Sequence, residues 1–257
     1  MSRVLVTGAT SGIGRAFAVA FARRGDDLVL VARDSARLDA FAGELSASTH
    51  VNAVPQVADL LDATDLVAVE ARLHSVDEPV DILVNNAGMG TYGSFTSLDI
   101  DREDREVRLN VLTLVRLTHA ALGRMVAQGT GAILNISSLG AYQPAPYNAT
   151  YGATKAFVNS FTHSIHEEVR GSGVHVMLVC PGYTHTEFHE RAGLGPTSLP
   201  EFVWQSPEQV VGAALRDFDR RRSVSIPGAL NKTLGALSSS APAGISRRVA
   251  GAVIRRT

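Results

Sequence analysis

Residues 6–14 read VTGATSGIG, and this stretch decides the fold that the rest of the chain must follow. It joins a short β-branched run to a helical pattern that starts near Ile13. Its glycines let the backbone turn tightly and approach a ligand, while the helix N-terminus offers N–H groups to a pyrophosphate. The spacing is G-x-x-x-G-x-G, so a purely structural glycine turn is the alternative. The loop residues expected at a dinucleotide are Gly8, Thr10, Ser11, Gly12, Ile13 and Gly14.

The same strand-then-helix pattern repeats along the chain. Several runs are apolar almost throughout, as expected for parallel strands covered on both faces. The expected strands are VLVT (4–7), DLVLVA (27–32), VNAVPQVA (51–58), DILVN (81–85), AILNIS (132–137), VHVMLVC (174–180) and SVSIP (223–227). The expected helices cover 13–24, 35–47, 62–76, 102–127, 151–171 and 207–221. This alternation predicts an α/β fold with right-handed crossovers in a doubly wound sheet.

Composition narrows the function classes. The chain has 257 residues, of which 45% are hydrophobic and 19% charged, as in a compact globular protein. Its formal net charge of −1 gives no global field to recruit nucleic acid or an anionic membrane. The single cysteine, Cys180, excludes a disulfide within the chain and favours a cytoplasmic setting. We expect no signal peptide and no stable membrane insertion.

The end of the second expected strand indicates which dinucleotide is bound. An NAD site usually places an acid there for the adenosine ribose, but this chain has Ala32 followed by Arg33. An arginine can instead pair with a 2′-phosphate, which favours NADP(H) over NAD(H). The alternative is a solvated arginine. We interpret Asp34 as the N-cap of the helix that follows.

Two segments interrupt the regular pattern. Residues 183–206 contain Gly, Pro and Thr among apolar and aromatic residues, as is typical of a lid over a substrate. The apolar lid residues are Phe188, Leu194, Leu199, Phe202 and Trp204. Residues 228–257 form a C-terminal extension whose structure the sequence leaves open; its end, ISRRVAGAVIRRT, has the pattern of a short basic helix.

A phenol and an ammonium stand four residues apart in YGATK (151–155), so Tyr151 and Lys155 share one face of a helix. A phenol can donate a proton to an alkoxide if its pKa falls from ~10 toward neutrality, which requires ~4 kcal/mol. An ammonium at ~4 Å supplies about that much at an effective dielectric of ~20. Taken alone, such a pair is usually a surface contact worth a few tenths of a kcal/mol.

The ordered motifs TGATSGIG (7–14), Asp59, NNAG (85–88), Asn110, Ser138, YGATK (151–155) and PGYTHT (181–186) resemble the short-chain dehydrogenase/reductase family. The resemblance implies one Rossmann-type domain over 1–257 with a parallel sheet of about seven strands. It also implies a homodimer or homotetramer that pairs the helices at 102–127 and 151–171.

The resemblance assigns roles to individual residues. Tyr151 would be the acid/base, Ser138 would orient the carbonyl, and Asn110 would hold a water beside Lys155. Ser137 is the neighbouring candidate, but Ser138 has the family's thirteen-residue offset from the tyrosine. Further cofactor contacts are expected from Asp59, Leu60, Asn86, Ala87, Gly88, Tyr151, Lys155, Pro181, Gly182, Thr184 and Thr186.

Together these features predict an NADP(H)-dependent oxidoreductase that interconverts a carbonyl and an alcohol, acting as the reductase of a lipophilic carbonyl compound. The alternatives are an NAD-linked alcohol dehydrogenase and a non-catalytic sensor or scaffold that binds NADP(H). His185 and His189 lie at i and i+4, but the H-E-x-x-H order and a third ligand are missing, so we expect no metal. Cys180 is expected to be an inert packed thiol.

Overall fold

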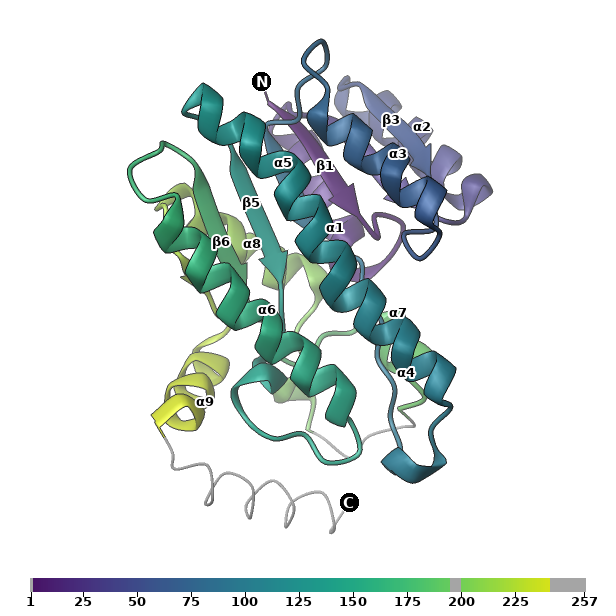
Figure 1. The fold of residues 1–257 in the computed structure, drawn as a ribbon, viewed down its shortest axis with the longest axis vertical. Coiled ribbons are helices and arrows are strands. Elements are labelled where there is room, and N and C mark those ends of the chain that lie inside the picture. The colour runs from purple at the N-terminus through teal and green to yellow at the C-terminus, as the bar shows by residue number, and fades with distance from the viewer. Residues whose placement is uncertain (1, 195–199, 241–257) are drawn as a thin grey trace.

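The computed structural model describes residues 2–194 and 200–240, and the side chains of 236–240 are not described. Seven parallel strands form one sheet in the order β3-β2-β1-β4-β5-β6-β7 (Figure 1). The strands are β1 (Arg3–Thr7), β2 (Asp27–Ala32), β3 (Ala53–Val57), β4 (Ile82–Asn85), β5 (Ala132–Ile136), β6 (His175–Val179) and β7 (Val224–Ser225). The predicted α/β fold, a single domain with a doubly wound sheet, is confirmed.

Helices connect successive strands. The α-helices are α1 (Gly12–Arg23), α2 (Ser35–Thr49), α3 (Ala63–His74), α4 (Ile100–Val107), α5 (Leu114–Gln128), α6 (Ala149–Glu168), α7 (Glu187–Arg191), α8 (Pro207–Asp219) and α9 (Ala229–Ser240). Shorter helical segments are η1 (Phe95–Ser97), η2 (Arg108–Thr113), η3 (Leu139–Tyr142) and η4 (Glu201–Val203). Part of the C-terminal extension therefore forms a helix, α9, whereas the basic pattern at its end lies outside the described residues.

Helices cover both faces of the sheet, and alternate strand residues supply the two cores. Val4 and Val6 of β1 pack with Phe17 of α1, in the layer that also contains α2 and α8. Leu5 points to the opposite face, where Leu117 of α5 and residues of α3 complete the second core. The long helices α5 and α6 run side by side over β5 in Figure 1. The glycine loop thus begins from a strand that is fixed on both sides.

One predicted helix differs from the structure. Residues 102–127 were expected to form a regular α-helix, but a π-helical segment, η2, separates α4 from α5. Asn110 lies within η2. A π-bulge inserts one residue into the helical repeat and is frequent at functional sites. It changes the direction in which the side chains on either side of Asn110 point.

Strand order places a ligand site at one position on the sheet. β1 has β2 on one side and β4 on the other, and the connections from β1 and β4 go to opposite sides. Ligands of doubly wound sheets bind at the carboxyl ends of the strands at such a switch point. The loops after β1, β4, β5 and β6 meet there.

Candidate functional site

The glycine loop after β1 is packed too tightly to accept side chains. A Cβ added at Gly14 would lie well under 3.0 Å from both the Gly8 carbonyl oxygen and the Asn86 side-chain amide. A Cβ at Gly12 would lie 2.8 Å from Cγ2 of Thr186. Gly8 itself has φ +65°, in the left-handed region that favours glycine. The loop after β6 therefore closes directly against the loop after β1.

Polar side chains hold this loop to the end of β4. The Thr7 hydroxyl accepts hydrogen bonds from the backbone N–H groups of Asn86 and Ala87, each at 3.0 Å. The side-chain amide of Asn86 donates to the carbonyl oxygens of Thr7 at 3.0 Å and Gly8 at 3.3 Å. Asn86, expected at the cofactor ribose, thus uses its amide group to fix the shape of the glycine loop.

The N-terminus of α1, like that of α6, lacks a side-chain cap. In α2, α3, α4 and α8 an Asp or Ser side chain accepts a hydrogen bond from a first-turn N–H. In α1 the N-cap residue Ser11 makes no such bond. The uncapped N–H groups and the dipole of a twelve-residue helix suit a phosphate group. This arrangement fits the dinucleotide that the sequence predicts.

Arg33 lies exposed just after β2, on the adenosine side of the switch point. Its side chain has no hydrogen bond or ion pair with any part of the chain that the structure describes. Asp34 accepts a hydrogen bond from the N–H of Arg37 at 3.0 Å, so its predicted N-cap role is confirmed. Arg33 therefore remains available to an anionic ligand.

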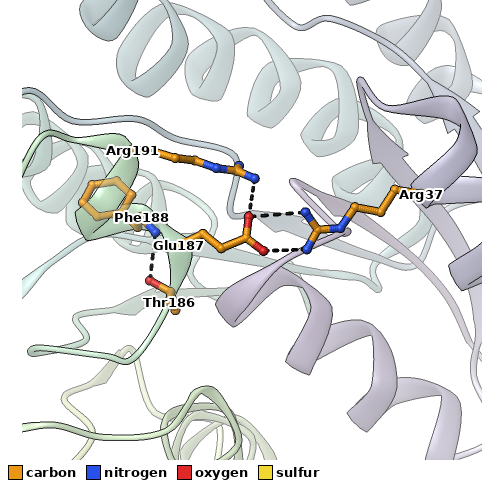
Figure 2. A network of polar contacts seen from close by, with 5 residues as sticks. All are labelled: Arg37, Thr186, Glu187, Phe188 and Arg191. Atoms are coloured by element: carbon orange, nitrogen blue, oxygen red, sulfur yellow. Dashed lines mark hydrogen bonds and ion pairs between the residues drawn. The ribbon is translucent and has the colours of Figure 1, made fainter.

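A salt bridge ties α2 to the segment predicted as a lid. Arg37 of α2 holds the Glu187 carboxylate of α7 through two contacts, 2.6 and 3.3 Å long, and Arg191 binds the same carboxylate (Figure 2). Thr186 caps α7 by accepting from the N–H of Phe188 at 3.3 Å. The two arginines hold the pKa of Glu187 below its usual value. The salt bridge thereby fastens α7, in the segment predicted as a lid, to α2.

Aromatic rings fill the space between the lid and the tyrosine. Phe188 of α7 packs against Tyr151 with 5.3 Å between ring centroids. His185 stacks on Trp204 at 4.8 Å, and His189 meets the same indole edge-on at 5.1 Å. The two histidines thus pack as rings, and within residues 2–194 and 200–240 no group of metal-ligating side chains occurs. Phe202, by contrast, is 77% exposed, and Leu199 lies outside the described residues.

The three expected catalytic side chains converge. Lys155 is 5% exposed; its ammonium lies 5.7 Å from the centroid of the Tyr151 ring and donates to the Ile136 carbonyl oxygen at 2.9 Å. Ser138 lies close enough to Tyr151 to act on the pKa of its phenol, which it lowers. The prediction that Tyr151 and Lys155 lie on one helix face is confirmed.

The two neighbouring serines differ in their surroundings. Ser137 is buried, and its hydroxyl binds the Lys155 carbonyl oxygen at 3.1 Å and the Asn159 side chain at 2.5 Å. Ser138 is partly exposed and accepts from the N–H of Gly140 at 3.1 Å. Ser137 joins β5 to α6, whereas Ser138 faces Tyr151. The structure places Ser138, not Ser137, beside the phenol.

Titration of the pair differs from the sequence argument, which expected Lys155 to lower the pKa of Tyr151. Burial instead raises the pKa of Tyr151 to about 12, although Ser138 acts to lower it and the negative charge of Glu106 adds to the rise. Burial also lowers the pKa of Lys155 to about 8. Desolvation outweighs the attraction between the two groups. At neutral pH Tyr151 is therefore a protonated phenol, the form that donates a proton.

Asn110 is 2% exposed and fully hydrogen-bonded. Its Oδ1 accepts from the N–H of Met89 at 3.0 Å, and its Nδ2 donates to the Met89 carbonyl oxygen at 2.8 Å and to Thr154 at 3.1 Å. A Cβ at Gly88 would lie 3.1 Å from Asn110 and 3.6 Å from the Lys155 ammonium. The side chain thus joins η2, the loop after β4, and α6 beside Lys155, the lysine predicted to take part in catalysis.

The remaining predicted residues surround the same cleft. Asp59 stabilises the turn after β3 by accepting from the N–H of Leu61 at 3.1 Å, and the Leu60 carbonyl accepts from Thr113. Pro181 accepts from the N–H of Leu139, and a Cβ at Gly182 would clash with Asn231 of α9. Thr184 is buried and lies opposite Gln205 in an isolated parallel β-bridge. The N–H of His185 donates to the Gln205 carbonyl oxygen at 3.0 Å, and the N–H of Gln205 donates to the Tyr183 carbonyl oxygen at 3.0 Å, so the two ends of the segment 183–206 lie side by side.

Sequence reasoning missed Glu106 and Thr91, whose side chains are joined by a hydrogen bond of 3.0 Å and are both buried. Glu106 precedes Asn110 by one helical turn, in a segment rich in charged residues. Nothing in the sequence distinguishes it from the solvent-facing acids beside it. The Arg37–Glu187 salt bridge was also missed, because its partners are 150 residues apart.

Comparisons with known proteins show the family to which the chain belongs. The family model described as short chain dehydrogenase matches residues 2–195. A short-chain dehydrogenase from Sphingobium yanoikuyae in complex with NADPH is 42% identical, with a TM-score of 0.85, and the match covers 94% of this chain and 96% of that one. The bulky-bulky ketone specific alcohol dehydrogenase from Comamonas testosteroni is 37% identical, with a TM-score of 0.80 and coverage of 94% and 95%.

Among curated relatives, the very-long-chain 3-oxoacyl-CoA reductase of Anas platyrhynchos is 33% identical over 216 residues, which are 82% of this chain and 67% of the relative. The chain belongs to the short-chain dehydrogenase family and is an oxidoreductase of that family. Across the part of the chain that the structure describes, no helix combines the length and apolar character needed to cross a membrane.

Proposed function

We propose that this protein is an NADP(H)-dependent oxidoreductase that reduces a lipophilic ketone or aldehyde to the corresponding alcohol. One observation carries the proposal: Ser138, Tyr151 and Lys155 converge beside a glycine loop that ends at an uncapped helix N-terminus. Phosphate binding and proton donation thus occur at the same switch point of the sheet.

Each residue has a task in carbonyl reduction. The nicotinamide, when bound, supplies the hydride. Ser138 orients the carbonyl oxygen, and Tyr151 gives its phenolic proton to that oxygen as negative charge develops there. An alkoxide is more basic than a tyrosinate, so a phenol with its pKa raised to about 12 still donates downhill. Lys155 stabilises the tyrosinate that remains, and Asn110 holds the loop that borders Lys155.

The lid supports a bulky, apolar substrate. Phe188 lies against the Tyr151 ring, and Tyr183 and Trp204 continue the aromatic wall with 5.3 Å between their centroids. Two relatives act, by their names, on a bulky ketone and on a very-long-chain 3-oxoacyl-CoA. We infer that the substrate is a ketone with large apolar groups, such as a fatty 3-oxoacyl chain, a steroid or an aromatic ketone.

A panel of carbonyl compounds tests this function. We expect the purified protein to oxidise NADPH with bulky aromatic, steroid and 3-oxoacyl ketones, with kcat/KM at least about tenfold above that for acetone, because apolar groups gain ~0.8 kcal/mol per buried CH₂. Loss of NADPH absorbance and the alcohol product are measured together. Binding of NADPH without turnover of any carbonyl would favour the non-catalytic sensor or scaffold.

Cofactor choice is tested at Arg33. We expect Arg33→Ala to weaken NADPH binding by about 10- to 100-fold, the value of a charge-assisted hydrogen bond, and to change NADH binding by less than about threefold. Fluorescence titration with both cofactors measures the effect. Arg23→Ala removes an equally exposed arginine at the far end of α1 and serves as the control. Tighter binding of NADH than of NADPH by the wild type would support the NAD-linked alcohol dehydrogenase, and an unchanged preference in Arg33→Ala would mean that Arg33 does not select the cofactor.

We further infer a homodimer or homotetramer and a cytoplasmic location. Leu112 is 53% exposed, and Val126 and Phe157 are each 42% exposed, on the helices that the family resemblance assigns to subunit pairing. Exposed apolar side chains on these helices support burial in an interface. Cys180 is a free, buried thiol, as expected for a packed cysteine, and is compatible with a reducing compartment.

A further inference from the structure

The loop at residues 88–91 forms one wall of the catalytic site, and each of its residues faces a different group. A Cβ at Gly88 would lie 3.6 Å from the Lys155 ammonium, and one at Gly90 would lie 3.3 Å from the Tyr151 ring. The N–H of Met89 donates to Asn110. The fourth residue, Thr91, is 1% exposed and donates its hydroxyl proton to Oε2 of Glu106 at 3.0 Å. A buried carboxyl group therefore lies directly behind the wall that contacts the catalytic pair.

Glu106 has an unusual environment for an acid. It is 0% exposed, and its Oε1 has no hydrogen-bond partner among the described residues. Burying a carboxylate without full hydrogen bonding is costly, so it stays protonated to higher pH than usual. Burial raises the pKa of Glu106 to about 7, and the hydrogen bond from Thr91 only partly opposes this. Glu106 thus titrates in the range in which an enzyme of this family would work.

The charged groups around Glu106 lie on two helices, α4 and α6. On α4 itself, Glu103 raises the pKa of Glu106 and Arg102 lowers it; on α6, Lys155 lowers it. In return, the carboxylate of Glu106 raises the pKa of both Lys155 and Tyr151. Glu103 is 4% exposed and hydrogen-bonded to Thr150, and it does not perturb Tyr151 or Lys155 to a resolved extent.

We propose that Glu106 is a positioning residue whose negative charge, acting through the loop at 88–91, keeps both Tyr151 and Lys155 protonated and so biases the site toward reduction. A carboxylate in a poorly solvated interior stabilises a nearby ammonium and disfavours a nearby tyrosinate. The bias toward reduction rests on the proposed function, whereas the effect of Glu106 on the protonation of Tyr151 and Lys155 does not.

The effect of Glu106 on the pair depends on pH, because only its ionised form carries a charge. Below its pKa Glu106 is neutral and leaves the pair unaffected. As the pH rises through neutrality the carboxylate forms, the pKa of Tyr151 and that of Lys155 rise, and the phenol keeps its proton into more alkaline solution. Reduction, which needs the phenol, is extended to higher pH, whereas oxidation, which needs the tyrosinate, is restrained.

The direct test is the ionisation of Tyr151, measured by tyrosinate absorbance as the difference between a protein and the same protein carrying Tyr151→Phe. We expect Glu106→Gln to lower the pKa of Tyr151 by about one unit, the effect of one charge at ~10 Å and an effective dielectric of ~20. The matched control is Glu103→Gln, a buried acid one turn away on the same helix, which should leave the Tyr151 titration unchanged. A pKa of Tyr151 that is the same in Glu106→Gln as in the wild type overturns the proposal.

Turnover gives the second measurement. In Glu106→Gln, the pH above which the reduction rate falls should move down by the same shift. In Glu103→Gln, this alkaline limit should stay where it is. Only the change in rate near neutral pH, which reports the ionisation of Glu106, should move to lower pH, because the pKa of Glu106 falls when Glu103 loses its charge. Equal effects of the two variants on both limbs would indicate a structural role and contradict the proposal. If no carbonyl is turned over but the tyrosinate titration shifts, the proposed function fails and the role of Glu106 stands.

Folding is not expected to confuse the result. The amide of Gln can still accept from Thr91, and the substitution removes a buried charge. Because the pKa of Glu106 is raised in the folded state, the wild type loses stability as the pH rises from the ordinary glutamate pKa through neutrality. Glu106→Gln should not show this loss and should melt no lower than wild type above neutral pH. If Glu106→Gln does not fold, Glu103→Gln decides the proposal. A change in reduction rate near neutral pH that moves to lower pH in Glu103→Gln supports it, and the absence of such a shift overturns it.

Discussion

Replacing Tyr151 by phenylalanine should lower kcat/KM for ketone reduction by about 10²- to 10⁴-fold, the usual contribution of a positioned general acid. The phenol is the group on whose pKa Ser138 acts, and its ring lies under the Lys155 ammonium and against Phe188. Phenylalanine keeps the ring contacts and removes only the proton donor. NADPH binding should stay within about twofold, because the glycine loop and Arg33 are untouched.

Tyr142→Phe is the matched control for this substitution. Tyr142 lies in η3, and its hydroxyl contacts only the thiol of Cys180, at 3.6 Å, among the partners that the structure describes. Burial raises the pKa of its phenol. We expect kcat/KM to change by less than about threefold. Comparable losses in both variants would mean that Tyr151 acts through packing, and full activity in Tyr151→Phe would exclude it as the proton donor.

The fold and the catalytic set could be predicted because their signals are local. Strand–helix alternation follows from apolar periodicity, and Tyr151 and Lys155 share a helix face through a spacing of four residues. The glycine loop is specified within nine residues. In each case residues close in sequence determine the geometry, so a pattern in the chain is enough to find it.

Other features depend on contacts between distant segments. Glu106 has the sequence surroundings of a solvent-facing acid, and only the packing of α4 against α6 and the loop at 88–91 buries it. The raised pKa of Tyr151 results from burial by the lid and the same loop, which a two-residue electrostatic argument omits. Propensity likewise does not reveal the π-helical segment at Asn110, because the bonds to Met89 and Thr154 stabilise it.

Gly14→Ala should disrupt the cofactor loop. The new Cβ would lie well under 3.0 Å from the Gly8 carbonyl oxygen and the Asn86 amide, and both are held in place by the bonds to β4. Forced overpacking costs about 3 kcal/mol when backbone must move. For a domain of this size that is a fall in Tm of roughly 10 °C. NADPH affinity should fall by at least about tenfold, since the loop must widen where it would meet the pyrophosphate.

Gly43→Ala separates this effect from that of adding a methyl group to any helix. Gly43 lies exposed in α2, where a Cβ would meet nothing within 4 Å, so the substitution should stabilise the protein by about 0.5–1 kcal/mol. Thermal melts and NADPH titrations of both variants check the contrast. A Gly14→Ala protein that melts like wild type and binds NADPH equally well would show that the loop yields at little cost. The close approach of α1 to Gly8 would then not be needed to shape the phosphate site.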